Sequence, residues 1–345
     1  MLMNSIQYRN ALRSLFPFLP DKGNETVLIT GATGLIGSCM ADALLFSNTE
    51  RNTDYHVIVL GRNEARLRER FSYARPDGRI VFIAQDINLP VSSGIQPDII
   101  IHAASNADPV AYALYPAQTL LTNIYGTKNM LDLAKENGAK LLLTSTFEVY
   151  GKIEDQDVYT ENMSGTIDQT SIRSCYPESK RSAELLLRCY VQQYGVNAVI
   201  ARLCSIYGPT MLANDSKAHA QFIRNGLAGE NIVLKSEGKP RRTYCYVIDA
   251  VAGLFLIVKR GKNGEAYNVS NENSIASIAQ VAQTAAGICG TEVVFDLPDD
   301  IEKKGFSKPQ NCILDNTKLR SLGFRGKYSL EAGLRETLEI LKSIE

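Results

Sequence analysis

The stretch TVLITGATGLIG, residues 26–37, decides the fold of this chain. Its first five residues, 26–30, form an apolar run with β-branched side chains, which predicts a short buried strand. Residues 34–46 have the pattern of a helix, and a turn with glycines spaced three apart joins the two elements. The stretch therefore predicts a βα unit at the start of a doubly wound sheet.

The glycines of this turn each meet a different demand of a dinucleotide site. The first permits a tight turn, the second lets the backbone approach a pyrophosphate, and the third lets the helix pack closely on the strand. The helix N-terminus also attracts negative charge. By itself the motif is also typical of an ordinary glycine-rich turn, but between a strand and a helix it predicts a bound dinucleotide. The residues that we expect to hold it here are Gly31, Thr33, Gly34, Leu35, Ile36 and Gly37.

Further apolar runs of strand length follow along the chain. They cover residues 56–60, 80–84, 98–102, 141–145 and 197–202. Strands that are apolar almost throughout indicate a parallel sheet covered by helices on both faces. We therefore predict an α/β fold, a Rossmann doubly wound parallel sheet with a smaller C-terminal substrate-binding lobe.

The pattern changes beyond residue 203, where the alternation loosens and turn signals appear. Residues 244–248 and 266–269 have the pattern of strands that return to the sheet. Leucines at the spacing of Leu330, Leu334 and Leu338 predict an amphipathic C-terminal helix, which Leu341 extends. The predicted parts are an N-terminal extension (1–24), an NAD(P)-binding Rossmann domain (25–203, with return segments at 244–270), and a substrate lobe (204–243 and 271–345).

The composition excludes several classes of partner. Lys and Arg number 37 and balance 37 Asp and Glu, so no strong field attracts nucleic acid or an anionic membrane. Seven cysteines without CxxC spacing argue against a disulfide framework and against a metal site. The apolar patch at residues 15–19 is too short for a signal peptide, and no run approaches the roughly 20 apolar residues of a membrane span. We expect a cytoplasmic protein.

The adenosine end of the expected dinucleotide site departs from the usual pattern. The second strand runs into Gly61 and Arg62, where an acidic residue would hold the ribose of NAD. Arg62 suits the 2′-phosphate of NADP or the adenine ring, and it is equally typical of a solvated loop. Asp86 and Ile87 follow the third strand, where adenine edges are read, although an aspartate is also common in turns. NAD is the expected cofactor, with NADP as the alternative.

Tyr176 and Lys180 stand four residues apart at the start of a predicted helix, so their side chains share one face. A lysine beside a phenol lowers the pKa of that phenol. Such a tyrosine can take a proton from a hydroxyl while hydride leaves the same carbon, and the lysine can hold the nicotinamide ribose.

Thr146 and Glu148 follow the strand at 141–145, at the edge where ligands bind in such sheets. Glu148 could act on a neighbouring carbon, or be a structural carboxylate.

Seven motifs resemble those of the extended short-chain dehydrogenase/reductase family, which includes nucleotide-sugar epimerases, dehydratases and decarboxylases. The motifs are TGATGLIG (30–37), DIIIHAAS (98–105), TNIYGTKNML (122–131), TSTFEVYG (144–151), YPESK (176–180), RLCSIYGP (202–209) and RRTYCYVIDA (241–250). The resemblance implies an enzyme that oxidises a nucleotide diphosphate sugar at C4 with tightly bound NAD(P).

The resemblance also assigns site residues. Thr146, Tyr176 and Lys180 fall on the family triad, and Arg242 falls on the arginine that contacts the diphosphate or nucleotide. A guanidinium suits that bidentate role. Further cofactor residues implied are Ala103, Ala104 and Asn123, beside His102; further substrate residues are Ser105, Ser145 and Cys204.

The reaction after C4 oxidation stays open among three alternatives. Phe147 stands where dehydratases place an aspartate, which leaves elimination of water without its usual acid. The run at 103–131 resembles UDP-glucuronate decarboxylases, yet Cys204 replaces an asparagine and Ser307-Lys308-Pro309 replaces an Arg-x-Pro pattern. A 4-epimerase needs only the triad and the cofactor, so it is our first expectation, with a UDP-glucuronate decarboxylase or hexose 4,6-dehydratase as alternatives.

Two hypotheses of other classes are an NADPH-dependent reductase, which Arg62 would suit, and a non-catalytic dinucleotide-binding protein. The second usually involves loss of the tyrosine or lysine, and both are present. The family further implies a homodimer through the predicted helices at 116–136 and 177–194, whose apolar faces alternatively only cover the sheet.

Overall fold

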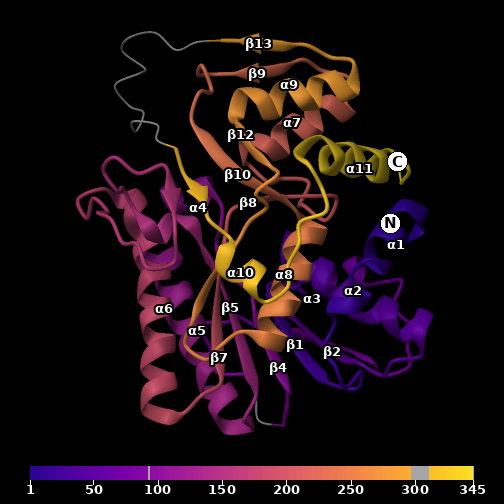
Figure 1. The fold of residues 1–345 in the computed structure, drawn as a ribbon. Coiled ribbons are helices and arrows are strands. Elements are labelled where there is room, and N and C mark those ends of the chain that lie inside the picture. The colour runs from indigo at the N-terminus through magenta and orange to yellow at the C-terminus, as the bar shows by residue number, and fades with distance from the viewer. Residues whose placement is uncertain (92–93, 297–310, 345) are drawn as a thin grey trace.

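Seven parallel strands form the central sheet of the molecule (Figure 1). The computed structural model describes residues 1–91, 94–296 and 311–344. The strand order is β11-β7-β5-β4-β1-β2-β3, so the winding direction reverses between β1 and β4. This is a doubly wound order, in which ligands bind at the reversal point. The strands are β1 (Thr26–Thr30), β2 (His56–Gly61), β3 (Ile80–Ala84), β4 (Ile99–His102), β5 (Lys140–Thr146), β7 (Ala198–Leu203) and β11 (Ala266–Val269).

Helices cover both faces of this sheet (Figure 1). In β1, Val27 and Ile29 join one hydrophobic core with α2 and α8, whereas Leu28 joins a second core with α5 and α6. Because neither face meets water, the strands are apolar at successive positions, as the sequence predicted. The covering helices are α2 (Leu35–Arg51), α5 (Pro116–Asn137), α6 (Cys175–Tyr194) and α8 (Val247–Arg260).

A smaller lobe lies above the central sheet in Figure 1 and contains its own three-stranded sheet, in the order β12-β10-β8. Strand β10 pairs in parallel with β8 and antiparallel with β12. The predicted C-terminal helix is confirmed as α11 (Leu330–Lys342), which buries Leu334 and Leu338. The other elements of this lobe are β8 (Ser205–Tyr207), α7 (Ala218–Leu227), β9 (Ile232–Leu234), β10 (Arg241–Tyr246), β12 (Ile275–Ser277), α9 (Ile278–Cys289) and β13 (Val293–Phe295).

The predicted return strand at residues 244–248 is wrong. Residues 244–246 belong to β10 of the smaller sheet, and α8 begins at Val247. Helix α8 is buried from Val247 to Val258, so its short apolar start resembles a buried strand in sequence. The place beside β7 is taken by β11, which confirms the other return strand that we predicted at 266–269.

The N-terminal extension packs on the outer side of α2. Its helix α1 (Ile6–Arg13) buries Tyr8 and Leu12, and the Tyr8 hydroxyl donates a hydrogen bond of 2.6 Å to the buried carboxylate of Asp42 in α2. Residues 36–48 of α2 are therefore buried on every side of the helix. This cover explains why α2 carries apolar residues on every side instead of on one stripe.

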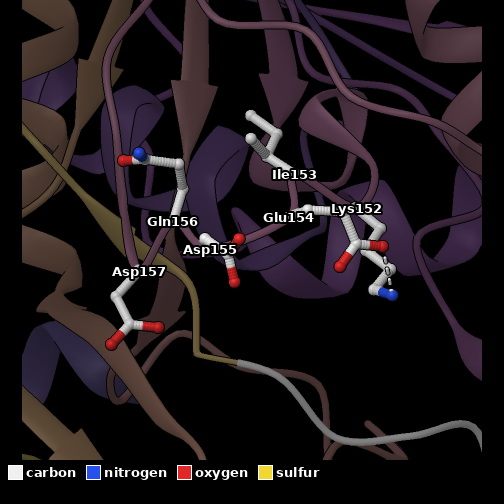
Figure 2. Close-up of a pocket in the computed structure, with 6 residues that line it drawn as sticks. All are labelled: Lys152, Ile153, Glu154, Asp155, Gln156 and Asp157. Carbon is white, nitrogen blue, oxygen red and sulfur yellow. Dashed lines mark hydrogen bonds and ion pairs between the residues drawn. The ribbon is translucent and has the colours of Figure 1, made fainter.

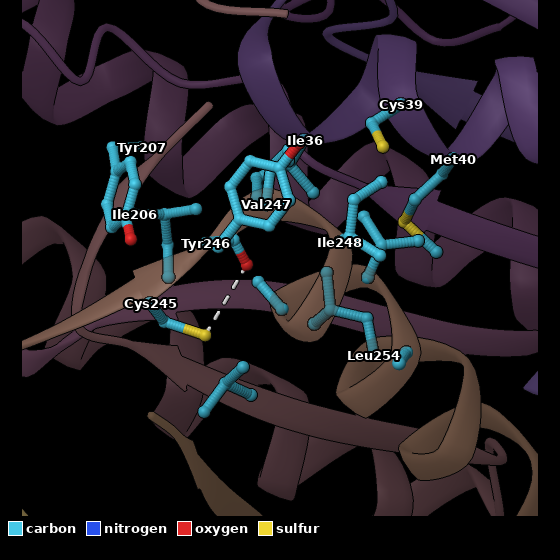
Figure 3. Close-up of a cluster of buried hydrophobic side chains, with 14 of the residues drawn as sticks. Ile36, Cys39, Met40, Ile206, Tyr207, Cys245, Tyr246, Val247, Ile248 and Leu254 are labelled. Atoms are coloured by element: carbon cyan, nitrogen blue, oxygen red, sulfur yellow. Dashed lines mark hydrogen bonds between the residues drawn. The ribbon is translucent and has the colours of Figure 1, made fainter. Parts of the chain in front are cut away.

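A continuous hydrophobic core links α2 to the smaller lobe (Figure 3). Ile36 and Met40 of α2 and Val247 of α8 meet Ile206 of β8 and Tyr246 of β10 in this core. Helix α2 starts at the glycine turn, so the same packing fixes the turn relative to the lobe.

The remaining elements are short, and β6 and β14 pair in a two-stranded sheet. No helix of the described ranges has the length and hydropathy required to cross a membrane. These elements are η1 (Leu2–Asn4), η2 (Phe16–Phe18), α3 (Glu64–Arg70), α4 (Pro109–Leu114), η3 (Phe147–Tyr150), β6 (Val158–Tyr159), η4 (Ile172–Ser174), β14 (Ile313–Leu314) and α10 (Thr317–Ser321).

Candidate active site

The glycine turn after β1 and the loop after β4 meet at the reversal point of the sheet. Gly31 has a φ of 65°, in the left-handed region. A Cβ atom at this position would lie 2.8 Å from backbone atoms of Ala103 and Ala104. Glycine alone satisfies both the conformation and the close approach. The predicted cofactor residues of the two loops are therefore side by side.

The N-terminus of α2 opens on this crevice. Gly34 is its N-cap, and no side chain of the described residues caps the first turn. The backbone N–H groups of Leu35, Ile36 and Gly37 are therefore available to an anion, with Thr33 partly exposed beside them. A Cβ at Gly37 would lie 2.5 Å from the Gly31 carbonyl oxygen, so this glycine lets helix and turn touch. Uncapped amides at a positive helix end fit the pyrophosphate of a dinucleotide.

The residues predicted at the adenosine end follow the neighbouring strands β2 and β3. Arg62 is exposed directly after β2. The Asp86 carboxylate accepts a hydrogen bond of 2.9 Å from the Asn88 backbone N–H, so it forms the turn after β3. Ile87 is buried, and its carbonyl accepts a hydrogen bond of 2.8 Å from the Asn129 side chain of α5. Arg62 and Asp86 are thus both exposed charged side chains at this end of the site.

Tyr176 lies in the first turn of α6 and meets residues from two other elements. Its ring is stacked on that of Tyr112 from α4, with centroids 4.6 Å apart. Thr146, the last residue of β5, and Tyr112 both have hydrogen-bonding interactions with the Tyr176 phenol. All three side chains are buried. The structure thus brings together the predicted pair Thr146 and Tyr176, and it adds Tyr112.

Lys180 is buried and hydrogen-bonds to the backbone of β5. The Lys180 Nζ donates a hydrogen bond of 3.0 Å to the Thr144 carbonyl, deep beside β5. Burial lowers the pKa of Lys180 to about 8. Burial also raises the pKa of Tyr176, and the Glu148 carboxylate raises it further. In the protein chain alone the net pKa of Tyr176 is therefore raised and not lowered.

Glu148 lies in the short turn η3, directly after Thr146. Its carboxylate forms an ion pair of 2.7 Å with the Arg173 guanidinium, which precedes α6. That guanidinium also lies 4.9 Å from the ring centroid of Tyr112. Glu148 and Arg173 therefore place opposite charges beside the paired tyrosine rings.

A chain of hydrogen bonds holds the first turn of α6 against α5 and the loop after β4. The Ser105 hydroxyl donates to the Asn123 carbonyl oxygen at 2.8 Å, and the Asn123 amide donates to the Ser179 hydroxyl at 2.8 Å. Ser179 donates in turn to the Tyr176 backbone carbonyl at 2.8 Å. Ser105 and Asn123 thus lie where they can fix the position of Tyr176.

Ser145 points away from this cluster. It stands next to Thr146 on β5, and successive strand residues face opposite sides of a sheet. Its hydroxyl donates a hydrogen bond of 2.6 Å to Glu184, which forms a buried ion pair of 2.7 Å with Arg202. Because its hydroxyl is bonded to Glu184 in the interior, Ser145 is not available to a substrate.

Arg242 and Cys204 line a small cavity beside the paired strands β8 and β10, together with Phe147 and Cys312. The Arg242 guanidinium lies 5.7 Å from the Phe147 ring centroid. Within the described ranges its buried Nε atom has no hydrogen-bond acceptor. Because a buried guanidinium N–H requires an acceptor, Arg242 is suited to an anionic ligand group.

Another hollow, of about 410 Å³, lies on the loop after η3 (Figure 2). It is lined by residues 152–157, which carry polar and charged side chains such as Lys152 and Asp155. The predicted site residues gather elsewhere, at the reversal point and around Tyr176. The predicted departure at Ser307-Lys308-Pro309 lies outside the described residues.

Sequence reasoning missed Tyr112, Arg173 and Ser179. Tyr112 lies within the quoted run 103–131, but its sequence position gives no sign that it stacks on Tyr176. Arg173 offered one signal, a cation three residues before the tyrosine of the YPESK motif. The roles of these residues depend on contacts between segments that are distant in the sequence.

Comparison with known proteins decides the family. Residues 27–270 match the model of the NAD-dependent epimerase/dehydratase family. The chain belongs to this family. Membership makes NAD the cofactor, as we expected ahead of NADP, and makes the chain an enzyme of the nucleotide-sugar epimerase/dehydratase type.

Members of this NAD-dependent epimerase/dehydratase family resemble the chain over nearly its full length. UDP-glucuronic acid decarboxylase 6 of Arabidopsis thaliana is 34% identical over 91% of this chain and 88% of its own length. A dTDP-glucose 4,6-dehydratase of Streptomyces venezuelae, solved with NAD, is 26% identical with a TM-score of 0.76 over 92% of this chain and 97% of its own. A UDP-glucose 4-epimerase of Thermotoga maritima is 25% identical with a TM-score of 0.76, over 93% of this chain and 100% of its own.

Proposed function

We propose that the chain oxidises a nucleotide diphosphate sugar at C4 and that its substrate is UDP-glucuronate, which it decarboxylates. The observation that carries this proposal is the cluster of Thr146, Tyr176 and the Glu148–Arg173 ion pair beside the glycine turn. The similarity to UDP-glucuronic acid decarboxylases supports the choice of reaction. The 4-epimerase that we expected first from the sequence is not confirmed by these relatives.

Bound at the crevice, NAD supplies a hydride acceptor and donor for C4 of the sugar. Tyr176 takes the proton from the C4 hydroxyl, and Thr146 donates a hydrogen bond to the same oxygen. Lys180, four residues on, holds the cofactor ribose and donates to the Thr144 carbonyl. The network through Asn123 and Ser179 keeps Tyr176 in place while these groups act.

The ketone at C4 prepares the loss of the carboxyl group, because C6 is then β to a carbonyl. The C5–C6 bond breaks, carbon dioxide leaves, and the electron pair passes to C5 and is delocalised onto the C4 oxygen. Hydrogen bonds from Thr146 and Tyr176 stabilise that oxygen. A proton then adds at C5, and we assign Glu148 to deliver it from water. Tyr176 then gives its proton back to the C4 oxygen as C4 regains the hydride from the bound cofactor, and the product is a UDP-pentose.

Arg242 holds the diphosphate in this proposal. Its buried Nε lacks an acceptor among the described residues, and a pyrophosphate oxygen would supply one. Cys204 lines the same small cavity beside Arg242.

The deciding experiment incubates the purified protein with UDP-, dTDP-, GDP- and CDP-sugars, UDP-glucuronate among them, and follows product mass. We expect UDP-glucuronate to lose carbon dioxide, and Tyr176→Phe to abolish this loss while the fold persists. Unchanged mass with a new sugar configuration would replace the proposal by a 4-epimerase, and loss of water by a dehydratase. Consumption of free NADPH would indicate a reductase, and full activity of the Tyr176→Phe variant would refute the role of the phenol.

We also propose a homodimer through α5 and α6. Leu121 and Tyr125 are exposed one turn apart on α5, and Leu185 is exposed on the neighbouring α6 together with Cys189. Because the side chains form an apolar stripe across two packed helices, a second copy of the same stripe is a suitable partner. Light scattering should give a dimer for the wild type and a monomer for the Leu121→Glu/Leu185→Glu variant. Leu212→Glu, on an exposed loop of the smaller lobe, serves as the control, and a monomeric wild type would contradict the proposal.

The proposed compartment is the cytoplasm. All seven cysteines are free thiols in the described structure, four of them buried. A reducing compartment preserves free thiols. Fractionation of the native cells would test this, and recovery with the extracellular fraction would contradict it.

A further inference from the structure

Arg173 is a half-exposed cation beside the catalytic cluster. It lies in η4, immediately before α6, and its side chain is 49% exposed. Its guanidinium makes two contacts in the cluster, an ion pair of 2.7 Å with Glu148 and an approach of 4.9 Å to the ring centroid of Tyr112. Tyr112 is in turn stacked on Tyr176. The cation therefore lies one side chain away from the phenol that we assign to the C4 hydroxyl.

The position next to the phenol determines which part of the sugar Arg173 can reach. In a hexose ring C5 adjoins C4, so the substituent on C5 falls beside the groups that flank Tyr176. Glu148 and Arg173 both act electrostatically on the Tyr176 phenol, with opposite sign. Glu148 repels a carboxylate at this place, whereas a guanidinium binds one with two parallel hydrogen bonds.

The bond between Arg173 and Glu148 is easy to exchange. An ion pair with a half-exposed partner contributes little net free energy, because water and salt screen it. Lys180 is less suited to this role, since it is buried and donates to the Thr144 carbonyl. Arg173 can therefore leave Glu148 for a second carboxylate at small cost.

We propose that Arg173 selects a carboxylate on C5 of the sugar by moving its guanidinium from Glu148 to the substrate. The exchange binds an acidic sugar and at the same time frees the Glu148 carboxylate to act at C5. A neutral sugar offers no partner for the guanidinium, so Glu148 keeps its ion pair. The inference rests on the proposed function and adds the residue that distinguishes an acidic sugar from a neutral one.

The test measures binding separately from turnover. Calorimetry on the NAD-loaded protein gives the Kd of UDP-glucuronate and of UDP-xylose, which lacks the carboxyl carbon. Tyr176→Phe serves as the common background that blocks turnover, and the two ligands are compared with Arg173 present and with Arg173→Gln added. We expect Arg173→Gln to raise the Kd of UDP-glucuronate by about 10- to 100-fold, which is the effect of losing hydrogen bonds to a charged group. The Kd of UDP-xylose should change by less than about threefold. Arg173→Lys should recover part of the loss, because a lysine keeps the charge without the planar fork.

A matched control is Arg335→Gln on α11, which breaks an exposed arginine–glutamate pair of 2.8 Å far from the cluster and should change neither Kd. Equal weakening of both ligands by Arg173→Gln, or no weakening of either, would overturn the inference. The melting temperature of Arg173→Gln should match that of the wild type, since the side chain is half exposed. Failure of the wild type to release carbon dioxide would refute the proposed function and leave the binding comparison as a separate result.

Discussion

The ring of Tyr112 lies stacked on the ring of Tyr176, with centroids 4.6 Å and planes 18° apart. The two residues are far apart in the sequence and come from α4 and α6. Tyr112 thus covers one face of the phenol that we assign to proton transfer, and its hydroxyl interacts with the same phenol. A residue without any recognised motif is therefore part of the site.

Tyr112→Phe should keep the stacked ring and lose the hydroxyl, which lowers kcat by about threefold to tenfold. Tyr112→Leu loses the ring as well and should lower kcat by about a further threefold to tenfold. Steady-state rates at saturating UDP-glucuronate measure both effects. Tyr115→Phe, an exposed tyrosine that ends α4, is the control. Equal rates for Tyr112→Leu and the wild type would contradict a role for the stack.

Alanine substitutions at Gly37 and at Gly34 should distinguish an effect on stability from an effect on cofactor binding. A Cβ at Gly37 would lie 2.5 Å from the Gly31 carbonyl oxygen, so Gly37→Ala should lose about 1–3 kcal/mol of stability and also bind NAD more weakly. At Gly34 the nearest atom would be 3.3 Å away, so Gly34→Ala should lose less stability than Gly37→Ala.

The added methyl group of Gly34→Ala should still block the approach of a pyrophosphate and raise the Kd of NAD by at least about tenfold, or ~1.4 kcal/mol. Fluorescence titration with NAD and thermal unfolding of both variants give the comparison. A Gly34→Ala variant with wild-type NAD affinity would contradict binding of the pyrophosphate at this turn.

Replacing Asp42 should destabilise the whole chain, because this buried carboxylate accepts hydrogen bonds of 2.6 Å from Tyr8, 2.5 Å from Tyr73 and 3.1 Å from Arg70. Asp42→Ala leaves the Arg70 charge partly buried without its partner. It should lower the free energy of unfolding, measured in urea, by about 3–5 kcal/mol. Tyr8→Phe removes one bond to a charged group and should cost about 1.5–3 kcal/mol.

The control for these two variants is Glu50→Gln, which removes an exposed ion pair with Arg13. It should cost less than about 1 kcal/mol. A Tyr8→Phe variant as stable as the wild type would show that the N-terminal extension is not fixed through this bond.

The activity should fall above pH 8. Burial lowers the pKa of Lys180 to about 8, below its usual 10.5, so the ammonium loses its proton as the pH rises through this value. The neutral amine binds the cofactor ribose less well, so kcat/KM should decrease about tenfold per pH unit beyond the midpoint. Lys180→Arg keeps its charge and should show a flat alkaline limb at a lower rate. An unchanged alkaline limb in that variant would assign the titration to another group.

The fold could be predicted well because its signals are local. The glycine turn and the apolar runs specify β1 and its neighbours, and helix α2 only extends further than predicted, to Arg51. The strand at 244–248 was wrong because a buried helix start and a buried strand have the same short apolar sequence.

The candidate site was predictable only where a motif names a residue. Thr146 and Tyr176 meet as the family pattern predicts, whereas Ser145, its neighbour in the same motif, donates to Glu184. The sequence places two adjacent strand residues on opposite faces, but it does not say which face carries the site.

By itself, the sequence determined the βα unit at residues 26–37, the sheet strands and the one-turn spacing of Tyr176 and Lys180. These features depend on residues that are near one another in the chain, where backbone geometry fixes the relation. The tertiary structure alone decided the stack of Tyr112 on Tyr176, the ion pair of Arg173 with Glu148 and the cover of α2 by the N-terminal helix. Those contacts join segments that are distant in sequence. Packing brings the segments together, and no periodic pattern of residues in the sequence records such a contact.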